Sequence, residues 1–204
     1  MTQPARKPSR IQIENRQRIR DAALGLFATH GFRGTTLDQI AGACGMHKPN
    51  LIYYYDSKEA IHIDLLNTLM TEWLSPLDAM DPEGDPLEEI LEYIRKKMEM
   101  SRLYPRESRL FANEIVQGAP RMLPHLERTL KPLFDQQCKI LEDWMAAGKL
   151  ARMHPAHLIF SIWAVTQHYA DFEAQIAVLL PGQDRFADGA DQFVETMFRK
   201  LLTP

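Results

Sequence analysis

The sequence predicts an all-α fold of nine helices. Apolar residues recur along almost the whole chain with a period near 3.6 residues, which is the repeat of an amphipathic helix. Glycine and proline stand between these stretches, where helices end, and no segment shows the two-residue alternation of a convincing strand. The chain has 204 residues and is 45% hydrophobic, which is enough for one domain or two small ones.

The first two helices are bounded by signals that are easy to locate. One face of the first helix carries the apolar residues Ile19, Ala22, Ala23, Leu26 and Phe27. Gly31 ends this helix. Thr36 and Gln39 have the spacing of a capping box, which predicts a short second helix through Ala43.

The third helix follows a turn at Gly45 and is expected from about Lys48 to Tyr55. Pro49 is tolerated in its first turn, where backbone amides have no acceptor within the helix. Leu51 and Tyr55 are four residues apart and therefore share one face. We expect this pair to pack on the first two helices, as core residues.

Six further helices are expected, most of them bounded by serine, proline or glycine. Ser57 caps a long fourth helix whose buried stripe contains Ile61, Leu65, Leu69 and Trp73. The proline-rich segment 81–86 is a loop by composition. The remaining helices are placed at about 87–103, 105–117, 123–147 with a bend near Pro132, 155–180 and 185–202.

Charge and cysteine content narrow the class of protein. The first sixty residues carry nine lysines and arginines against five acids, whereas the rest of the chain has a net charge of -7. A basic segment on an acidic body suits a polyanionic partner, although a solvated arm gives the same pattern. No apolar run has the length of a membrane helix, and no signal peptide is recognisable. With Cys44 and Cys138 both expected to be reduced, we predict a cytoplasmic protein without membrane contact.

Two short helices joined by a glycine-containing turn, after a basic helix, fit a helix-turn-helix. The segments GFRGTTLDQIA (31–41), GMHKPNLIYYY (45–55) and SKE (57–59) resemble the TetR family of transcriptional regulators. This resemblance implies a TetR-like architecture in which three helices bind DNA and six bind an effector and dimerise. The corresponding boundaries are a flexible basic arm at 1–9, a DNA-binding domain at 10–56 and an effector and dimerisation domain at 57–204. The expected partners are a palindromic double-stranded operator, a small-molecule effector and a second copy of the chain.

The predicted DNA contacts follow from the chemistry of the side chains near the third helix. Lys48 and Lys58 suit phosphates, and the nearby hydroxyl groups suit phosphate oxygens. Asn50 can pair with adenine, and Ile52 can contact a thymine methyl group. His47 stands where the family most often has a Ser or Thr cap, so it either caps weakly or reaches DNA. The predicted set is Thr35, His47, Lys48, Asn50, Ile52, Tyr53, Tyr54 and Lys58. An amphipathic helix with a polar outer face is the alternative.

The C-terminal part resembles a narrower group, the pyrimidine-utilisation regulators of the TetR family. The segments that carry this resemblance are 92–95, 108–111, 118–120, 157–160, 162–164 and 166–172. Members of this branch sense uracil or thymine and control pyrimidine breakdown. In the family, effector binding moves the fourth helix, which here carries Trp73 and Lys58.

The predicted effector-binding residues are Trp73, Trp163 and Gln167. Trp163 and Gln167 are four residues apart on one helix, so an indole and a carboxamide share a face. The indole can stack on a flat heterocycle, and the carboxamide offers one donor and one acceptor. Trp73 can close the other side. Alternatively, both tryptophans are plain core residues and Gln167 caps a backbone group.

Other chemistry is sparse, so we expect no enzyme, no cofactor and no metal site. No nucleotide-binding, hydrolase or metalloprotease motif occurs. His154 and His157 lack further ligands at suitable spacing and are interpreted as capping or surface residues. Two alternatives to the pyrimidine-responsive repressor stay open. One is a TetR-type regulator of a hydrophobic drug or fatty acid, and the more remote one is a nucleobase-binding enzyme.

Overall fold

The computed structural model describes residues 9–186 and 189–204, so most of the predicted arm at 1–9 lies outside the described residues. All regular structure in the described part is helical, which confirms the predicted all-α fold. The chain divides into two compact units, Met1–Leu66 and Asn67–Pro204, and the division falls inside α4. None of the helices within the described ranges is long and apolar enough to cross a membrane.

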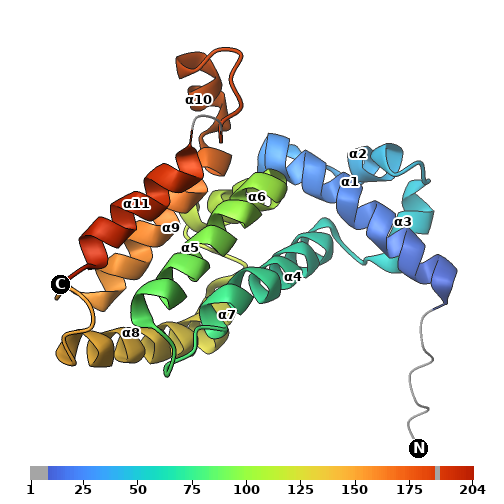
Figure 1. Ribbon diagram of the computed structural model, residues 1–204. Helices are drawn as coiled ribbons and strands as arrows, with labels where there is room; N and C mark the ends of the chain where they lie inside the picture. The colour runs from blue at the N-terminus through green and yellow to red at the C-terminus, as the bar shows by residue number, and fades with distance from the viewer. Residues whose placement is uncertain (1–8, 187–188) are drawn as a thin grey trace, which may run out of the picture. The chain divides into compact units, whose positions relative to one another are not determined.

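The first unit contains α1 (Arg10–Gly34), α2 (Leu37–Ala43), α3 (Lys48–Tyr54) and the start of α4 (Lys58–Asp78), labelled in Figure 1. Gly31 has φ 68° and ψ 174°, so the helical path of α1 breaks at the predicted glycine. The side chain of Thr36 accepts a hydrogen bond from the backbone N–H of Gln39, and the side chain of Gln39 accepts one from Thr36. The predicted capping box is therefore confirmed.

A small apolar core holds these helices together. Its fully buried members include Ile19, Ala23, Phe27, Ile40 and Ile61. Leu51 and Tyr55 are also buried, as predicted. The hydroxyl of Tyr55 donates to a carboxylate oxygen of Asp64 at 2.6 Å, and burial together with this carboxylate raises the pKa of Tyr55 to about 12. The inner face of α3 is thus packed against this core, and its other face is exposed.

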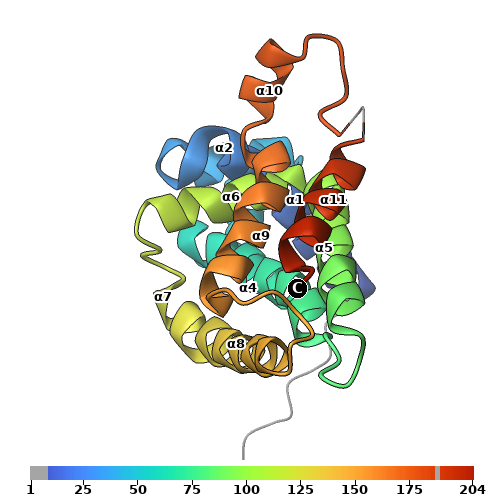
Figure 2. The same cartoon turned by 60° about the vertical axis from the view of Figure 1, so that its left-hand side comes forward.

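The second unit contains the rest of α4 and most of the helices. These are α5 (Pro86–Leu103), α6 (Pro105–Val116), α7 (Leu123–His125), the π-helix η1 (Leu126–Leu130), α8 (Lys131–Ala146), α9 (Pro155–Asp171), α10 (Glu173–Leu179) and α11 (Ala190–Leu202). Helix α5 packs against both α9 and α11, and the three ribbons run side by side in Figures 1 and 2. Their facing sides supply the core, which includes Ile90, Ile94, Leu158, Ile162, Val194 and Phe198.

The predicted seventh helix, 123–147, is divided into α7, η1 and α8. The backbone N–H of Lys131 donates to the carbonyl of Leu126, five residues earlier, which is the bond of a π-helix. Pro132 follows directly and has no N–H to donate, so the bonding pattern cannot continue unchanged through it. The expected bend near Pro132 therefore takes the form of a π-helical turn.

The predicted eighth helix, 155–180, is also divided. Phe172 leaves the helical conformation with φ −107° and ψ 27°, and α10 starts again at Glu173. Arg109 donates to a carboxylate oxygen of Glu173 at 2.6 Å, and Arg185 pairs with the same carboxylate. The break thus has no proline or glycine beside it. It lies next to ion pairs that Glu173 makes with arginines from other parts of the chain. The last helix, α11, begins at Ala190, five residues later than predicted.

Candidate functional site

The turn between α2 and α3 is that of a helix-turn-helix. Cys44 ends α2, and Gly45 follows it with φ 66°. The guanidinium of Arg18 on α1 donates to the carbonyl of Cys44 at 2.7 Å. A Cβ added to Gly45 would lie 3.3 Å from this guanidinium. Glycine therefore serves both the backbone of the turn and the space that Arg18 occupies.

The outer face of α3 presents several of the predicted DNA-contacting residues. Lys48, Asn50, Ile52 and Tyr53 are exposed. Nζ of Lys48 lies 2.9 Å from a carboxylate oxygen of Asp38, so this carboxylate competes with a phosphate for the ammonium. The side chain of Asn50 makes no hydrogen bond within the described part of the chain, and its amide is therefore available to a base edge.

Two polar residues of α1, which sequence analysis missed, hold the tyrosines of α3. Nε2 of Gln12 donates to the hydroxyl of Tyr53 at 3.3 Å, and Nδ2 of Asn15 donates to the hydroxyl of Tyr54 at 2.7 Å. Each hydroxyl accepts in these bonds and keeps its own hydrogen to donate. The start of α1 thus orients both phenols while leaving them able to donate to phosphate oxygens.

Two of the predicted phosphate contacts, Thr35 and Lys58, bond to backbone carbonyls in the structure. Thr35 is fully buried, and its hydroxyl donates to the carbonyl of Gly31 at 2.9 Å. Nζ of Lys58 donates to the carbonyls of Phe32 and Thr35, at 2.7 and 2.6 Å, and lies over the ring of Phe32. Both side chains satisfy carbonyls at the end of α1, a position that favours cations and donors. His47 is exposed at the start of α3 and makes no side-chain cap.

A cavity of about 370 Å³ lies within the second unit, and we call it the Trp73 cavity. Residues from α4, α5, α6, η1 and α9 line it. Its apolar lining consists of Met70, Trp73, Leu74, Phe111, Ile115, Leu126 and Leu130, and Tyr93, Lys97, Trp163 and Gln167 complete it. A largely apolar cavity of a few hundred Å³ with few polar groups is typical of a small-molecule site.

The three predicted effector residues, Trp73, Trp163 and Gln167, all line this cavity. The indole N–H of Trp163 donates to the hydroxyl of Tyr93 at 2.7 Å, so the polar edge of that ring is already bonded. Burial of Tyr93 raises the pKa of its hydroxyl, which keeps it neutral. The carboxamide of Gln167 makes no hydrogen bond to any described residue and remains available to a ligand.

Lys97 is a charged lining residue that sequence analysis missed. It is 4% exposed, and its Nζ lies 4.3 Å from the centroid of the Trp73 ring. Burial lowers the pKa of Lys97 to about 8, and the negative charge of Asp171 on α9 partly opposes this shift. The missed signal was its position, because residue 97 falls on the same helical stripe as the buried Ile90, Ile94 and Ser101.

Replacing this buried amine should stabilise the ligand-free protein. We expect Lys97→Met to raise the free energy of unfolding at pH 7 by about 1 to 3 kcal/mol, because methionine keeps the volume and removes the desolvation cost. The folded-state pKa near 8 lies below the unfolded value, so this gain should be full below about pH 8 and shrink as pH rises toward 10.5. Urea unfolding of both proteins from pH 7 to 10 measures it. A constant difference between them would contradict the assignment.

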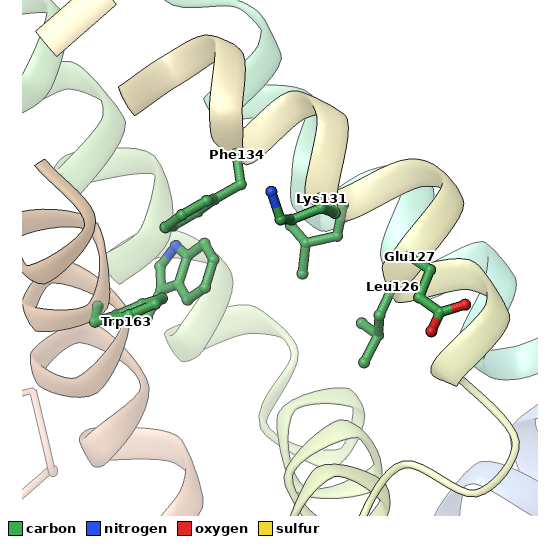
Figure 3. A pocket seen from close by; sticks show the side chains of 7 residues that line it. Leu126, Glu127, Lys131, Phe134 and Trp163 are labelled. Atoms are coloured by element: carbon green, nitrogen blue, oxygen red, sulfur yellow. The ribbon is translucent and has the colours of Figure 1, made fainter. Parts of the chain in front are cut away.

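Next to the Trp73 cavity lies an open groove of about 520 Å³, here called the aromatic groove. Leu126, Leu130 and Trp163 line both spaces and so lie between them. Figure 3 shows Phe134 and Trp163 close together on one side of the groove, and their ring centroids are 6.0 Å apart. The indole of Trp163 thus has aromatic neighbours in the groove, Phe134 and also Phe160 with its ring centroid 5.8 Å away.

A second apolar surface covers neighbouring parts of α9 and α11. Val165, Phe193, Met197 and Leu201 lie on it, and together with Ser161 they define what we call the α9–α11 face. Phe193 and Leu201 are 64% and 46% exposed, and they lie beside the buried stripe of α11 that contains Val194, Phe198 and Leu202. An exposed apolar stripe on a helix is typical of an interaction surface.

The two histidines at the start of α9 belong to the surface. Both His154 and His157 are exposed, and their ring centroids are 4.8 Å apart. His154 makes no side-chain cap hydrogen bond, which corrects the capping alternative for this residue. No cluster of three His, Cys, Asp or Glu side chains with metal-site geometry occurs in the described ranges.

Two family profiles match consecutive parts of the chain. Residues 19–65 match the profile of the bacterial regulatory proteins of the tetR family, and residues 66–204 match that of the YcdC-like protein C-terminal region. The chain therefore belongs to the TetR family of DNA-binding transcriptional regulators, and it is not an enzyme.

The chain is similar to the HTH-type transcriptional regulator RutR of Escherichia coli K12. The two are 43% identical over 196 residues, which cover 96% of this chain and 92% of that protein. This similarity confirms the resemblance to the pyrimidine-utilisation regulators. A more distant relative, the HTH-type transcriptional repressor SCO4008 of Streptomyces coelicolor, is 24% identical over 91% of this chain and 93% of its own length.

Solved structures agree with this assignment at the level of the fold. AibR in complex with isovaleryl coenzyme A and operator DNA matches with a TM-score of 0.72 and 17% identity, over 93% of this chain and 98% of that chain. The regulator SCO4942 from Streptomyces coelicolor matches with a TM-score of 0.71 and 22% identity, over 92% and 98%. At these identities the likeness establishes the fold alone.

Proposed function

We propose that this protein is a homodimeric repressor in the cytoplasm that uracil or thymine releases from a palindromic operator, so that genes of pyrimidine breakdown are expressed. The observation that carries the proposal is the meeting of Trp73, Trp163 and Gln167 around one cavity. The similarity to RutR supports the same effector class. Residues 10–56 would bind DNA, and residues 57–204 would bind the effector and dimerise.

The Trp73 cavity suits a flat, neutral ring. The face of Trp163 offers a stacking surface, while its N–H is already bonded to Tyr93. The carboxamide of Gln167 can accept from a ring N–H and donate to the neighbouring carbonyl of the pyrimidine. A purely hydrophobic effector would leave the carboxamide of Gln167 without a partner in the cavity. The unpaired polar side chains in the lining therefore favour the pyrimidine over such an effector.

The DNA-binding surface is proposed to be the exposed side of α3. His47, Lys48, Asn50, Ile52, Tyr53 and Tyr54 are its members. Asn50 and Ile52 would read bases, whereas Lys48 and the two tyrosine hydroxyls would position the helix on phosphates. Thr35 and Lys58 are left out because their polar atoms are bonded to carbonyls of α1.

Helix α4 is the element that can connect effector and DNA. It begins in the first unit, and its later part carries Trp73 into the lining of the cavity. A ligand that binds better to one position of α4 shifts the protein toward that position by its difference in affinity. We propose that the pyrimidine-bound position is the one that fits the operator poorly.

Substituting Gln167 tests the effector assignment. Gln167→Leu keeps the volume of the side chain and removes its hydrogen bonds, which leaves the ring N–H and carbonyl of the ligand unpaired. We expect uracil and thymine to bind about 1 to 3 kcal/mol more weakly to this variant. Isothermal titration of uracil, thymine, cytosine, a purine and a fatty acid, beside an operator-release assay, measures this.

A matched control is Gln137→Leu, which alters a buried glutamine that does not line the cavity. It should bind uracil as the unaltered protein does. If uracil and thymine bind to neither protein and a fatty acid binds to both, the effector is a different one and only the TetR-type regulator remains.

A further inference from the structure

Lys97 places a buried cation in the Trp73 cavity, and its contact with the ring of Trp73 does not by itself compensate for the cost of burial. Lys97 is 4% exposed and lines the cavity, and its Nζ makes no hydrogen bond or ion pair with the described residues. A buried ammonium without an acceptor is costly, so its presence needs a compensating interaction. The face of Trp73, 4.3 Å away, supplies a part of this compensation through a cation–π contact.

The position of Lys97 along the cavity follows from the contact between α5 and α9. Tyr93 on α5 is bonded to Trp163 on α9, and each helix advances one turn in about four residues. Lys97 stands one turn beyond Tyr93, and Gln167 stands one turn beyond Trp163. Both side chains line the same cavity, so an ammonium and a carboxamide border it beyond the Trp163–Tyr93 pair.

The charge balance around Lys97 favours a neutral acceptor over an anion. Asp171 follows Gln167 by one turn of α9, and its negative charge acts on Lys97. The hydroxyl of Ser108 on α6 donates to this carboxylate, and the positive charge of Arg109 also acts on it. A ligand carboxylate would add a negative charge near Asp171, whereas a carbonyl oxygen accepts from the ammonium without changing the net charge.

We propose that Lys97 is a specificity-determining residue that donates a hydrogen bond to the 4-carbonyl oxygen of the effector and thereby selects an oxo-pyrimidine over an amino-pyrimidine. This inference rests on the proposed pyrimidine response. It also changes the role of Trp73, whose ring face holds the ammonium from behind while Trp163 supplies the stacking surface. Cytosine would place an amino donor against the ammonium wherever uracil presents the 4-carbonyl, which leaves two donors facing each other.

The test replaces one ligand atom and one side chain in turn. A thiocarbonyl sulfur accepts hydrogen bonds less well than a carbonyl oxygen, so 2-thiouracil and 4-thiouracil each weaken one acceptor of uracil. Calorimetric titration of uracil and both thio analogues into the unaltered protein should show a greater loss of affinity for 4-thiouracil than for 2-thiouracil. In Lys97→Met, uracil should bind about 10- to 100-fold more weakly, the factor expected for a hydrogen bond to a charged group. In this variant the two thio analogues should also no longer differ in affinity, because the side chain that distinguishes them has been removed.

Lys96→Met is the matched control, because Lys96 is the exposed neighbour that pairs with Glu92 on the surface of α5. It should bind all three ligands as the unaltered protein does. Thermal unfolding of each variant confirms that it is folded. Equal binding of uracil and both thio analogues by the unaltered protein overturns the inference without any variant. If Lys97→Met binds uracil with undiminished affinity, Lys97 is not a specificity residue even though the pyrimidine response stands. If the unaltered protein does not bind uracil at all, the proposed function fails first.

Discussion

Raising the salt concentration from about 50 to about 200 mM should lower the affinity of this protein for its operator by about a thousandfold or more. Lysines and arginines that neutralise phosphates release condensed counterions, and about six such contacts per dimer suffice for this loss. The first unit has the necessary cations, since Arg10, Arg16, Arg18, Arg33 and Lys48 are exposed there. Fluorescence anisotropy with labelled genomic fragments over a salt series measures the effect.

Two single substitutions separate the phosphate contacts from the base contacts. Lys48→Ala should weaken binding to all sequences alike and make the salt dependence shallower by about one contact. Asn50→Ala should cost about 1 to 3 kcal/mol, chiefly on the preferred sequence. If Asn50→Ala weakens operator and random DNA equally, Asn50 does not recognise a base. A salt series without preference for any fragment would refute specific binding.

The parts of the fold that sequence predicted well are those set by local chemistry. The capping box of Thr36 and Gln39 needs only residues three apart, and the break at Gly31 needs only a positive φ. The buried faces of the first four helices follow from apolar spacing in the same way. The break at Phe172 could not be predicted from local spacing, because the arginines that bind the adjacent Glu173 come from other parts of the chain.

The candidate site shows a similar division between residue type and environment. Thr35 and Lys58 have the right chemistry for phosphate, but packing directs their polar atoms to carbonyls at the end of α1. Lys96 and Lys97 are adjacent and alike in sequence, yet one is on the surface and the other lines the Trp73 cavity. Composition treats such a pair as two solvated charges. Only the helical stripe around Ile94 distinguishes the buried lysine from its neighbour.

The α9–α11 face is the surface on which the proposed dimer depends. On α11 its apolar side chains are Phe193, Met197 and Leu201, which are spaced at four residues beside the buried stripe of that helix. Two copies related by a twofold axis would bring four helices together through the same residues of each copy. One short recognition helix reads few bases, so high affinity requires two half-sites to be bound by one dimer.

We expect Phe193→Asp to produce a folded monomer that binds the operator about 100- to 10,000-fold more weakly, because the second half-site then loses its high effective concentration. Phe193 is 64% exposed within one chain, so the substitution leaves the core of the protomer intact. In a twofold interface the new carboxylate enters from both copies and must be buried without a partner, which costs several kcal/mol. Val116→Asp is the control, since Val116 is 87% exposed on α6 and lies outside the α9–α11 face. Analytical ultracentrifugation at micromolar protein should find the control dimeric and Phe193→Asp monomeric. If Phe193→Asp stays dimeric and keeps its operator affinity, the two copies associate through a different surface.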